Sequence, residues 1–188
     1  MSFVRCNFGQ ERISVMGTYA HGWDCGPLST SRTVAGAMAI IISRPNDIFP
    51  FKVGYPIPAS RITLGAKIDL MNTIGPSNLG LGPDPVEVSA VTSTSFTFLT
   101  LAGHHRGAGQ TIQFDTSSVS GQLRLLQSGT FNSYDPRQYA YNKGATGAWA
   151  LQAHNLRVAV GTVSDPSLAW AEKALDAVVK PVFLKVFP

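Results

Sequence analysis

The stretch of sequence that decides the fold covers residues 86–131 and reads VEVSAVTSTSFTFLTLAGHHRGAGQTIQFDTSSVSGQLRLLQSGTF. It contains four short runs rich in Val, Thr, Phe, Ile and Leu, which are residue types that β-strands favour. Turn residues separate the runs at Ser93–Thr94, at residues 103–109 and at residues 117–121. The alternation of runs and turns predicts a meander of four antiparallel strands.

Upstream of the meander, the sequence predicts one more strand and a short helical turn. Residues 62–71 alternate apolar and polar side chains, as a half-buried strand does. Residues 32–43 are apolar enough for a buried strand or a short helix, and their β-branched end favours a strand over residues 37–43. Pro45 suits the first position of a short helical turn over residues 45–51.

The first 31 residues form an extension whose place in the fold the sequence leaves open. Residues 11–19 have the composition of a strand. Residues 20–31 are rich in Gly, Pro and Ser, and we expect a loop there.

Downstream of the meander, the period of the apolar residues changes from two to that of a helix. Residues 132–146 are polar and predict a loop that carries three tyrosines. Residues 147–160 place Trp149, Ala153, Leu156 and Val160 on one helical face. Asp165 and Pro166 then suit the N-cap and first position of a second, amphipathic helix.

The order of strands followed by helices predicts an α+β fold, with a helix packed on one antiparallel sheet. The chain of 188 residues has the length of one domain. We expect residues 1–163 to form a single α+β domain, with residues 1–31 as an extension, and residues 164–188 to form an extra terminal helix.

Composition argues against several classes of protein. Charged residues make up 14% of the chain and the formal net charge is +4. The basic residues are scattered, whereas nucleic-acid binding needs a concentrated basic footprint. The longest apolar run, residues 34–42, is too short to span a bilayer. The first 14 residues lack the apolar core of a signal peptide, so we expect a cytoplasmic protein that binds no nucleic acid.

Several of these pieces resemble the START-like helix-grip (SRPBCC-type) superfamily over about residues 37–163. They are the segments AMAIIIS and RPNDIF, the strand ITLGAKIDL, the meander, and the helix ATGAWALQAHNLRVAVG. The segment TLAGHHRGAG also resembles the T-L-x-G-H strand end of one uncharacterised branch of that superfamily. The resemblance implies a strongly curved sheet closed by the C-terminal helix, with a cavity between them. In this family such cavities hold lipids, sterols, polyketides or other apolar molecules, and some members are cyclases or aromatases.

Two polar segments are candidates for catalytic residues. His104, His105 and Arg106 follow a predicted strand and are flanked by glycines, so they are either acid–base groups at a cavity mouth or a solvated turn. Asp24 and Cys25 belong to an Asp-Cys-Gly-Pro segment that resembles the nucleophile segment of some papain-like peptidases. In that hypothesis His104 or His105 would activate Cys25; the alternative is a buried thiol in a loop.

Aromatic residues are the candidates for ligand binding, because rings with a polar tip suit a mostly apolar molecule. Packing of a loop or core explains them equally well. The candidates are Trp23, Phe96, Phe98, Tyr134, Tyr139, Tyr141 and Trp149.

A metal site and a cofactor are not predicted. Apart from His21 and Cys25, the cysteines and histidines lack the spacing that zinc ligands usually have. The remaining candidate ligands for zinc are Cys6, His104, His105 and His154.

The sequence therefore predicts a protein that binds an apolar small molecule. The protein either stops at binding or also cyclises or rearranges that molecule. Confinement and one or two polar groups suffice for such chemistry. A thiol hydrolase that uses Cys25 is one alternative. A non-catalytic assembly protein, with a homodimer among its forms, is another.

Overall fold

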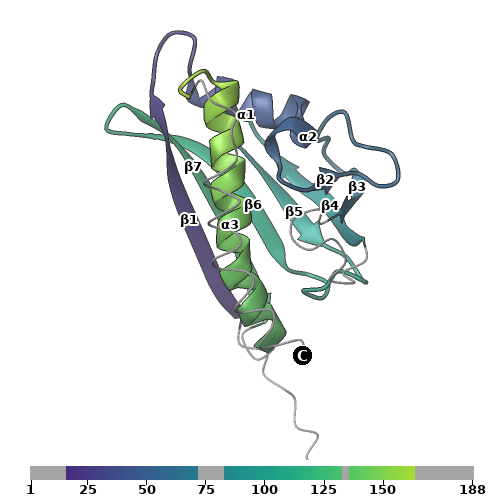
Figure 1. Ribbon diagram of the computed structural model, residues 1–188. Coiled ribbons are helices and arrows are strands. Elements are labelled where there is room, and N and C mark those ends of the chain that lie inside the picture. The colour runs from purple at the N-terminus through teal and green to yellow at the C-terminus, as the bar shows by residue number, and fades with distance from the viewer. Residues whose placement is uncertain (1–15, 72–82, 133–135, 164–188) are drawn as a thin grey trace, which may run out of the picture.

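A seven-stranded antiparallel sheet forms the centre of the protein in its computed structural model, which describes residues 16–71, 83–132 and 136–163 (Figure 1). The strand order is β1-β7-β6-β5-β4-β3-β2, so that the first strand of the chain lies beside the last one. The strands are β1 (Met16–Pro27), β2 (Lys52–Val53), β3 (Lys67–Met71), β4 (Asp84–Val91), β5 (Ser95–Thr100), β6 (Thr111–Val119) and β7 (Gln122–Asn132).

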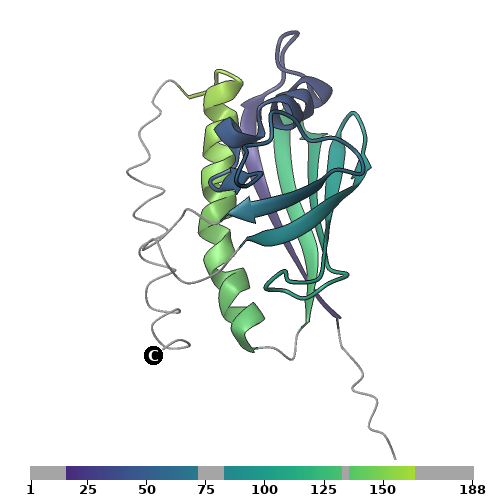
Figure 2. The same cartoon turned by 90° about the vertical axis from the view of Figure 1, so that its right-hand side faces the viewer.

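Helices cover one side of this sheet. The long helix α3 (Pro136–Ala159) runs along the concave side, as the side view in Figure 2 shows. The short helices α1 (Val34–Ser43) and α2 (Pro45–Ile48) lie together near the C-terminal end of α3. This arrangement confirms the predicted α+β fold, with a curved antiparallel sheet and a C-terminal helix packed over it. No helix of the described residues is both long and apolar enough to cross a membrane.

The sheet has an inner face toward α3 and an outer face, because side chains alternate along each strand. On β5 the inner residues are Phe96, Phe98 and Thr100, all of which are buried. On β7 they include Leu123, Leu125 and Gln127, which are fully buried. The inner face therefore changes from apolar residues to polar residues along the strands.

An aromatic cluster fills the apolar part of the space between the sheet and the helices. The Phe114 ring stacks on Phe96 at a centroid distance of 4.8 Å and meets Phe49 edge-on at 5.1 Å. Trp149 of α3 contacts the same Phe114 ring at 5.6 Å. Two of the predicted ligand-binding residues, Phe96 and Phe98, are therefore wholly buried members of this core.

The strand predicted at residues 37–43 is wrong, because this segment belongs to helix α1. Thr33 caps the helix by accepting a hydrogen bond from the Gly36 backbone N–H at 3.0 Å. The buried residues of α1 are Ala37, Met38, Ile41 and Ile42, which recur with a helical period. Burial of this face against the sheet outweighs the preference of isoleucine for strands.

The loop predicted at residues 20–31 is also wrong over its first part, because β1 continues to Pro27. Its inner positions are Tyr19, His21, Trp23 and Cys25, which are less exposed than the residues between them. The glycines of this segment obscured the alternation, since they carry no side chain on either face. Pairing with β7 over almost the whole strand holds the segment extended.

Three smaller boundaries differ as well. Residues 136–146, predicted as loop, are the first turns of α3. The strand predicted at 62–71 forms only over Lys67–Met71. The third strand of the meander continues to Val119, and the turn to β7 is the pair Ser120–Gly121, whose φ angles are both positive. The predicted short helix after Pro45 is confirmed, whereas the predicted helix at 164–188 lies outside the described residues.

Candidate functional site

The candidate site is a group of polar side chains at one end of the inner face, which we call the polar end cluster. The start of β4 contributes Asp84, the loop between β5 and β6 contributes His104, His105 and Arg106, β1 contributes Tyr19, and Gln110 directly precedes β6. Four of these residues are at most 8% exposed: Asp84, His104, Arg106 and Gln110. The side chains of His104 and Arg106 are therefore buried, although the glycines of this loop are exposed.

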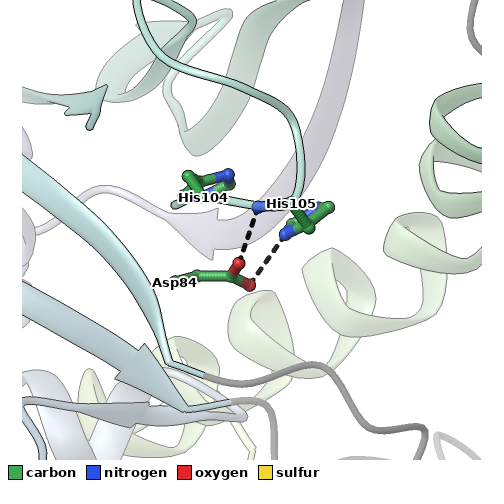
Figure 3. A group of neighbouring side chains, drawn as sticks. All are labelled: Asp84, His104 and His105. Carbon is green, nitrogen blue, oxygen red and sulfur yellow. Dashed lines mark hydrogen bonds and ion pairs between the residues drawn. The ribbon is translucent and has the colours of Figure 1, made fainter. Parts of the chain in front are cut away.

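Asp84, which is buried, and His105, which is partly buried, form a close pair (Figure 3). Asp84 Oδ2 lies 2.8 Å from His105 Nδ1, and Asp84 Oδ1 accepts a hydrogen bond from the His105 backbone N–H at 3.0 Å. Desolvation by burial raises the pKa of Asp84, but its hydrogen bond to the His105 ring and the charge of that ring outweigh burial and leave the pKa lowered. Asp84 is therefore ionised at neutral pH and fixes the orientation of the His105 ring.

His104 is neutral and lies against His105. Its ring stacks on the His105 ring at a centroid distance of 4.5 Å, and its Nδ1 accepts a hydrogen bond from the Arg106 backbone N–H at 3.1 Å. Burial, with a smaller contribution from the neighbouring His105, lowers the pKa of His104 to about 3. A nitrogen that accepts a backbone N–H cannot carry a proton itself, so the hydrogen bond and the pKa agree.

Arg106 connects the loop to β1, which is an edge strand of the sheet. Its guanidinium carbon lies 5.0 Å from the centre of the Tyr19 ring, in a cation–π contact. Tyr19 pairs with Gly129 of β7. A Cβ atom on Gly129 would lie 2.8 Å from Tyr19 Oη and would overlap the Thr111 carbonyl oxygen. Glycine at this position therefore lets the Tyr19 ring lie close over β7.

The conformation of the loop follows from its local sequence. Gly103 and Gly107 have positive φ angles, which glycine adopts without strain. Thr100 Oγ1 donates to the Gly107 carbonyl oxygen at 2.6 Å and accepts from the Gln110 backbone N–H at 2.8 Å. These contacts hold the ends of the loop together and turn His104 and Arg106 inward.

A second polar group lies deeper under α3, and we call it the amide relay. Trp23 Nε1 donates to Gln127 Oε1 at 2.7 Å. Gln127 Nε2 donates to Gln152 Oε1 of α3 at 2.9 Å and to the Trp149 carbonyl oxygen at 3.2 Å. Gln127 and Gln152 are both fully buried. Trp23 and Trp149, which the sequence marked as ligand-binding candidates, thus meet around two buried glutamines.

Cys25 and His104 lie at opposite ends of the sheet. On β1, Asp24 pairs with Arg124 of β7, next to the Ser120–Gly121 turn, whereas the loop with His104 follows the other end of β5. Asp24 Oδ1 accepts from the Gly26 backbone N–H at 2.8 Å. Burial raises the pKa of the Cys25 thiol to about 11. The structure therefore brings neither histidine of the loop to Cys25, and it keeps that thiol protonated.

Because Cys25 is fully buried, we expect it to react slowly with iodoacetamide in the folded protein. Labelling of a Cys6→Ser variant at neutral pH, followed by intact-mass spectrometry, measures this rate for Cys25 alone. The denatured variant provides the control rate for an accessible thiol. Labelling in the folded state as fast as in the denatured state would contradict the buried position.

Three other predicted site residues are tyrosines whose side chains the structure does not describe. The side chains of Tyr134, Tyr139 and Tyr141 lie outside the described residues. Their part in ligand binding therefore stays a prediction.

Asp84, His104 and His105 could together hold a metal ion. One ligand atom from each lies within 4.8 Å of the others, the single such group in the described parts of the chain. Asp84 Oδ2 already pairs with His105 Nδ1, however, and His104 Nδ1 accepts a backbone N–H. The Arg106 guanidinium adds a positive charge to the same loop. A hydrogen-bonded acid–base pair fits these contacts better than a metal centre does.

A groove of about 340 Å³ lies between α2, β2 and α3. Its polar side chains have partners: Asn46 bonds to Val53 and Ala59, and Asn155 donates to the Ile48 carbonyl oxygen at 3.1 Å. Apart from Lys52, its lining carries no charged side chain. We therefore place the candidate site at the polar end cluster and the amide relay rather than here.

Sequence reasoning missed most partners of the candidate residues. Asp84 stands in a Gly- and Pro-rich segment, and nothing in its spacing indicates that it contacts His105. The alternation of Leu123, Leu125 and Gln127 along β7 was the one signal for the amide relay. A glutamine in an inner position of a strand is a polar group that must find a buried partner.

The sheet order, the helix on its concave side and the short helices at its end define the START-like helix-grip fold. Among solved structures that share it are the Aha1 dimer from Colwellia psychrerythraea (TM-score 0.53, 11% identity, 77% of this chain and 96% of that one) and ginseng major latex-like protein 151 from Panax ginseng (0.52, 11%, 76% and 96%). DynU16, a putative protein in the dynemicin biosynthetic locus, is similar as well (0.51, 14%, 77% and 47%). At these identities the likeness concerns the fold. No family model matches the sequence, and no curated protein does.

Proposed function

We propose that this protein binds an apolar small molecule between the polar part of the sheet's inner face and α3, beside the aromatic cluster, with polar groups of that molecule held by the polar end cluster and the amide relay. One observation carries the proposal. Four buried side-chain atoms have no hydrogen-bond partner among the described residues: Tyr19 Oη, Gln110 Oε1, Trp149 Nε1 and Gln152 Nε2.

Unpaired polar atoms at this density are unusual for a plain core. More than about 90% of buried polar groups in native proteins are hydrogen-bonded, and leaving one unpaired costs about 1–3 kcal/mol. The four atoms come from β1, from the residue before β6 and from α3, and all four are buried. Oxygen atoms of a bound molecule would accept from Tyr19, Trp149 and Gln152, and a hydroxyl group would donate to Gln110 Oε1. The surrounding aromatic rings would contact its apolar part.

The fold supports the same proposal. The resemblance to the helix-grip superfamily implies a cavity for lipids, sterols, polyketides or other apolar molecules. DynU16 is described as a protein of a biosynthetic locus, and that setting agrees with a role in small-molecule chemistry.

The proposal has a catalytic form, in which the bound molecule is also cyclised or rearranged. The Asp84–His105 pair favours it, because an oriented imidazole can move a proton on a bound molecule. Tyr19 Oη would supply a hydrogen bond to an oxygen that gains charge. Turnover would appear as a change in the mass of the bound molecule after incubation, and simple binding would leave that mass constant.

Native mass spectrometry of the freshly purified protein, before and after denaturation, tests the binding. We expect an added mass that is lost on denaturation, and saturable binding of the apolar fluorophore N-phenylnaphthylamine to protein stripped of that mass. A protein that carries no added mass and binds no N-phenylnaphthylamine would contradict the proposal.

The structure gives less support to the other two hypotheses, a thiol hydrolase and a non-catalytic assembly protein. A buried, protonated Cys25 far from His104 does not support a thiol hydrolase. A homodimer stays a prediction, and one neighbour is described as a dimer. Light scattering on the eluting protein would measure the oligomeric state directly.

A further inference from the structure

The amide relay ends in a hydrogen-bond donor that has no acceptor. The relay passes from Trp23 Nε1 to Gln127 and from Gln127 Nε2 to Gln152 Oε1. The remaining amide atom, Gln152 Nε2, has no partner within the described residues, although Gln152 is 0% exposed. Water from outside the protein cannot reach this N–H without entering the interior.

Chemistry fixes the direction of the relay, so that the last atom must be a nitrogen. An indole N–H can only donate, and therefore the Gln127 atom facing Trp23 is an oxygen. The other amide atom of Gln127 faces the Trp149 carbonyl oxygen, which can only accept, and is therefore a nitrogen. This nitrogen also faces Gln152, whose near atom must be an oxygen. A flip of either amide would set two donors or two acceptors against each other.

The surroundings of this donor favour an acceptor oxygen on an apolar molecule. Trp149 Nε1, one helical turn before Gln152, is a second buried donor with no partner in the described chain. On the paired strands β1 and β7, Gln127 lies opposite His21, and the next pair of inward-facing positions is Tyr19 opposite Gly129. Two neutral donors match a neutral carbonyl oxygen, and neither of them supplies the opposite charge that a desolvated carboxylate needs.

We infer that Gln152 Nε2 binds a carbonyl oxygen of the ligand, and that the ligand is an apolar molecule with a ketone, ester or quinone carbonyl. This inference rests on the proposed function, because it names the chemical class bound at the same site. The relay contributes more than its last bond: each hydrogen bond polarises the next, so that the terminal N–H is a stronger donor than an isolated amide.

Two fluorescent probes separate this inference from binding in general. Prodan is a naphthalene that carries one ketone, and its emission shifts to the red when the ketone accepts a hydrogen bond. N-phenylnaphthylamine has a similar size and no carbonyl. The variant Gln152→Met removes the terminal N–H, and with it the Oε1 that accepts from Gln127, at nearly constant volume. Leu156→Met changes a buried residue of α3 without removing a donor.

We expect Gln152→Met to weaken Prodan binding about fivefold, as the loss of one hydrogen bond does, and to shift the emission of bound Prodan to the blue. We expect N-phenylnaphthylamine affinity to stay within about twofold, and Leu156→Met to bind both probes like the original protein. Equal losses for both probes, or no change in Prodan affinity and emission, would overturn the carbonyl site while leaving the proposed function intact. Failure of the original protein to bind either probe would overturn both.

Discussion

Replacing Phe114 by alanine is expected to lower the free energy of unfolding by about 3–5 kcal/mol, the usual cost of removing a buried aromatic ring. Phe114 is fully buried at the centre of the aromatic cluster. Its ring contacts Phe49, Phe96 and Trp149, which belong to α2, the sheet and α3 or adjoin them. Removing it opens a cavity where α2, the sheet and α3 meet, and rigid neighbours on several elements cannot all relax into the space.

Chemical denaturation by urea, followed by tryptophan fluorescence, would measure this change. Val119→Ala is a matched control, because Val119 lies on the same strand but is 49% exposed. We expect the control to change stability by less than about 0.5 kcal/mol. A Phe114→Ala variant as stable as Val119→Ala would mean that the aromatic cluster is not the principal packing of the core.

Acid is expected to destabilise the protein well above the pH at which carboxylates titrate. The pKa of His104 is about 3 in the folded protein, against an ordinary value of 6.5. Between these values the unfolded chain binds a proton that the folded protein does not, so stability falls as the pH falls below 6.5. At pH 5 this single histidine lowers the free energy of unfolding by about 2 kcal/mol relative to pH 7.

The variant His104→Asn isolates this contribution. The asparagine side-chain oxygen can accept the Arg106 backbone N–H in place of Nδ1, but it does not titrate. His21, whose pKa burial also lowers, acts in the same direction in both proteins. Asp84, whose pKa is lowered, loses its contribution only at more acidic pH. Denaturation curves at pH 7 and pH 5 that shift equally in variant and original protein would contradict a buried, neutral His104.

The local pattern of apolar residues was enough to predict those strands and helices whose buried side chains recur with a regular period. The strands of the meander bury alternate side chains, and the second half of α3 buries a face with helical spacing. The prediction of a strand at residues 37–43 was wrong because their isoleucines favour a strand locally, whereas the fold needs a helical face to cover the end of the sheet. The prediction of a loop in the second part of β1 was wrong because the extended form of this strand depends on β7. That strand lies about a hundred residues away in the chain, so the local sequence gives no sign of the pairing.

The candidate site was predictable only in part, for a related reason. Glycines around His104 marked a special loop, but whether it turns toward water or toward the interior depends on Thr100 and on Tyr19 of β1. The Asp84–His105 pair joins two segments that meet only when β4 and β5 are paired. Gln152 stands among apolar residues of a helix, and its role follows from its contact with Gln127.

The edge position of β1 also affects how the protein is made. In the described sheet β1 borders only β7, so that Thr18 pairs with Thr130 and His21 with Gln127. Ribosomes add about 5–20 residues per second, and β1 therefore emerges seconds before the strand that it needs. Throughout that interval both of its edges are unpaired, which invites pairing with other chains. The sheet can close only late in translation, and a chain cut short before β7 would lack the strand that completes it.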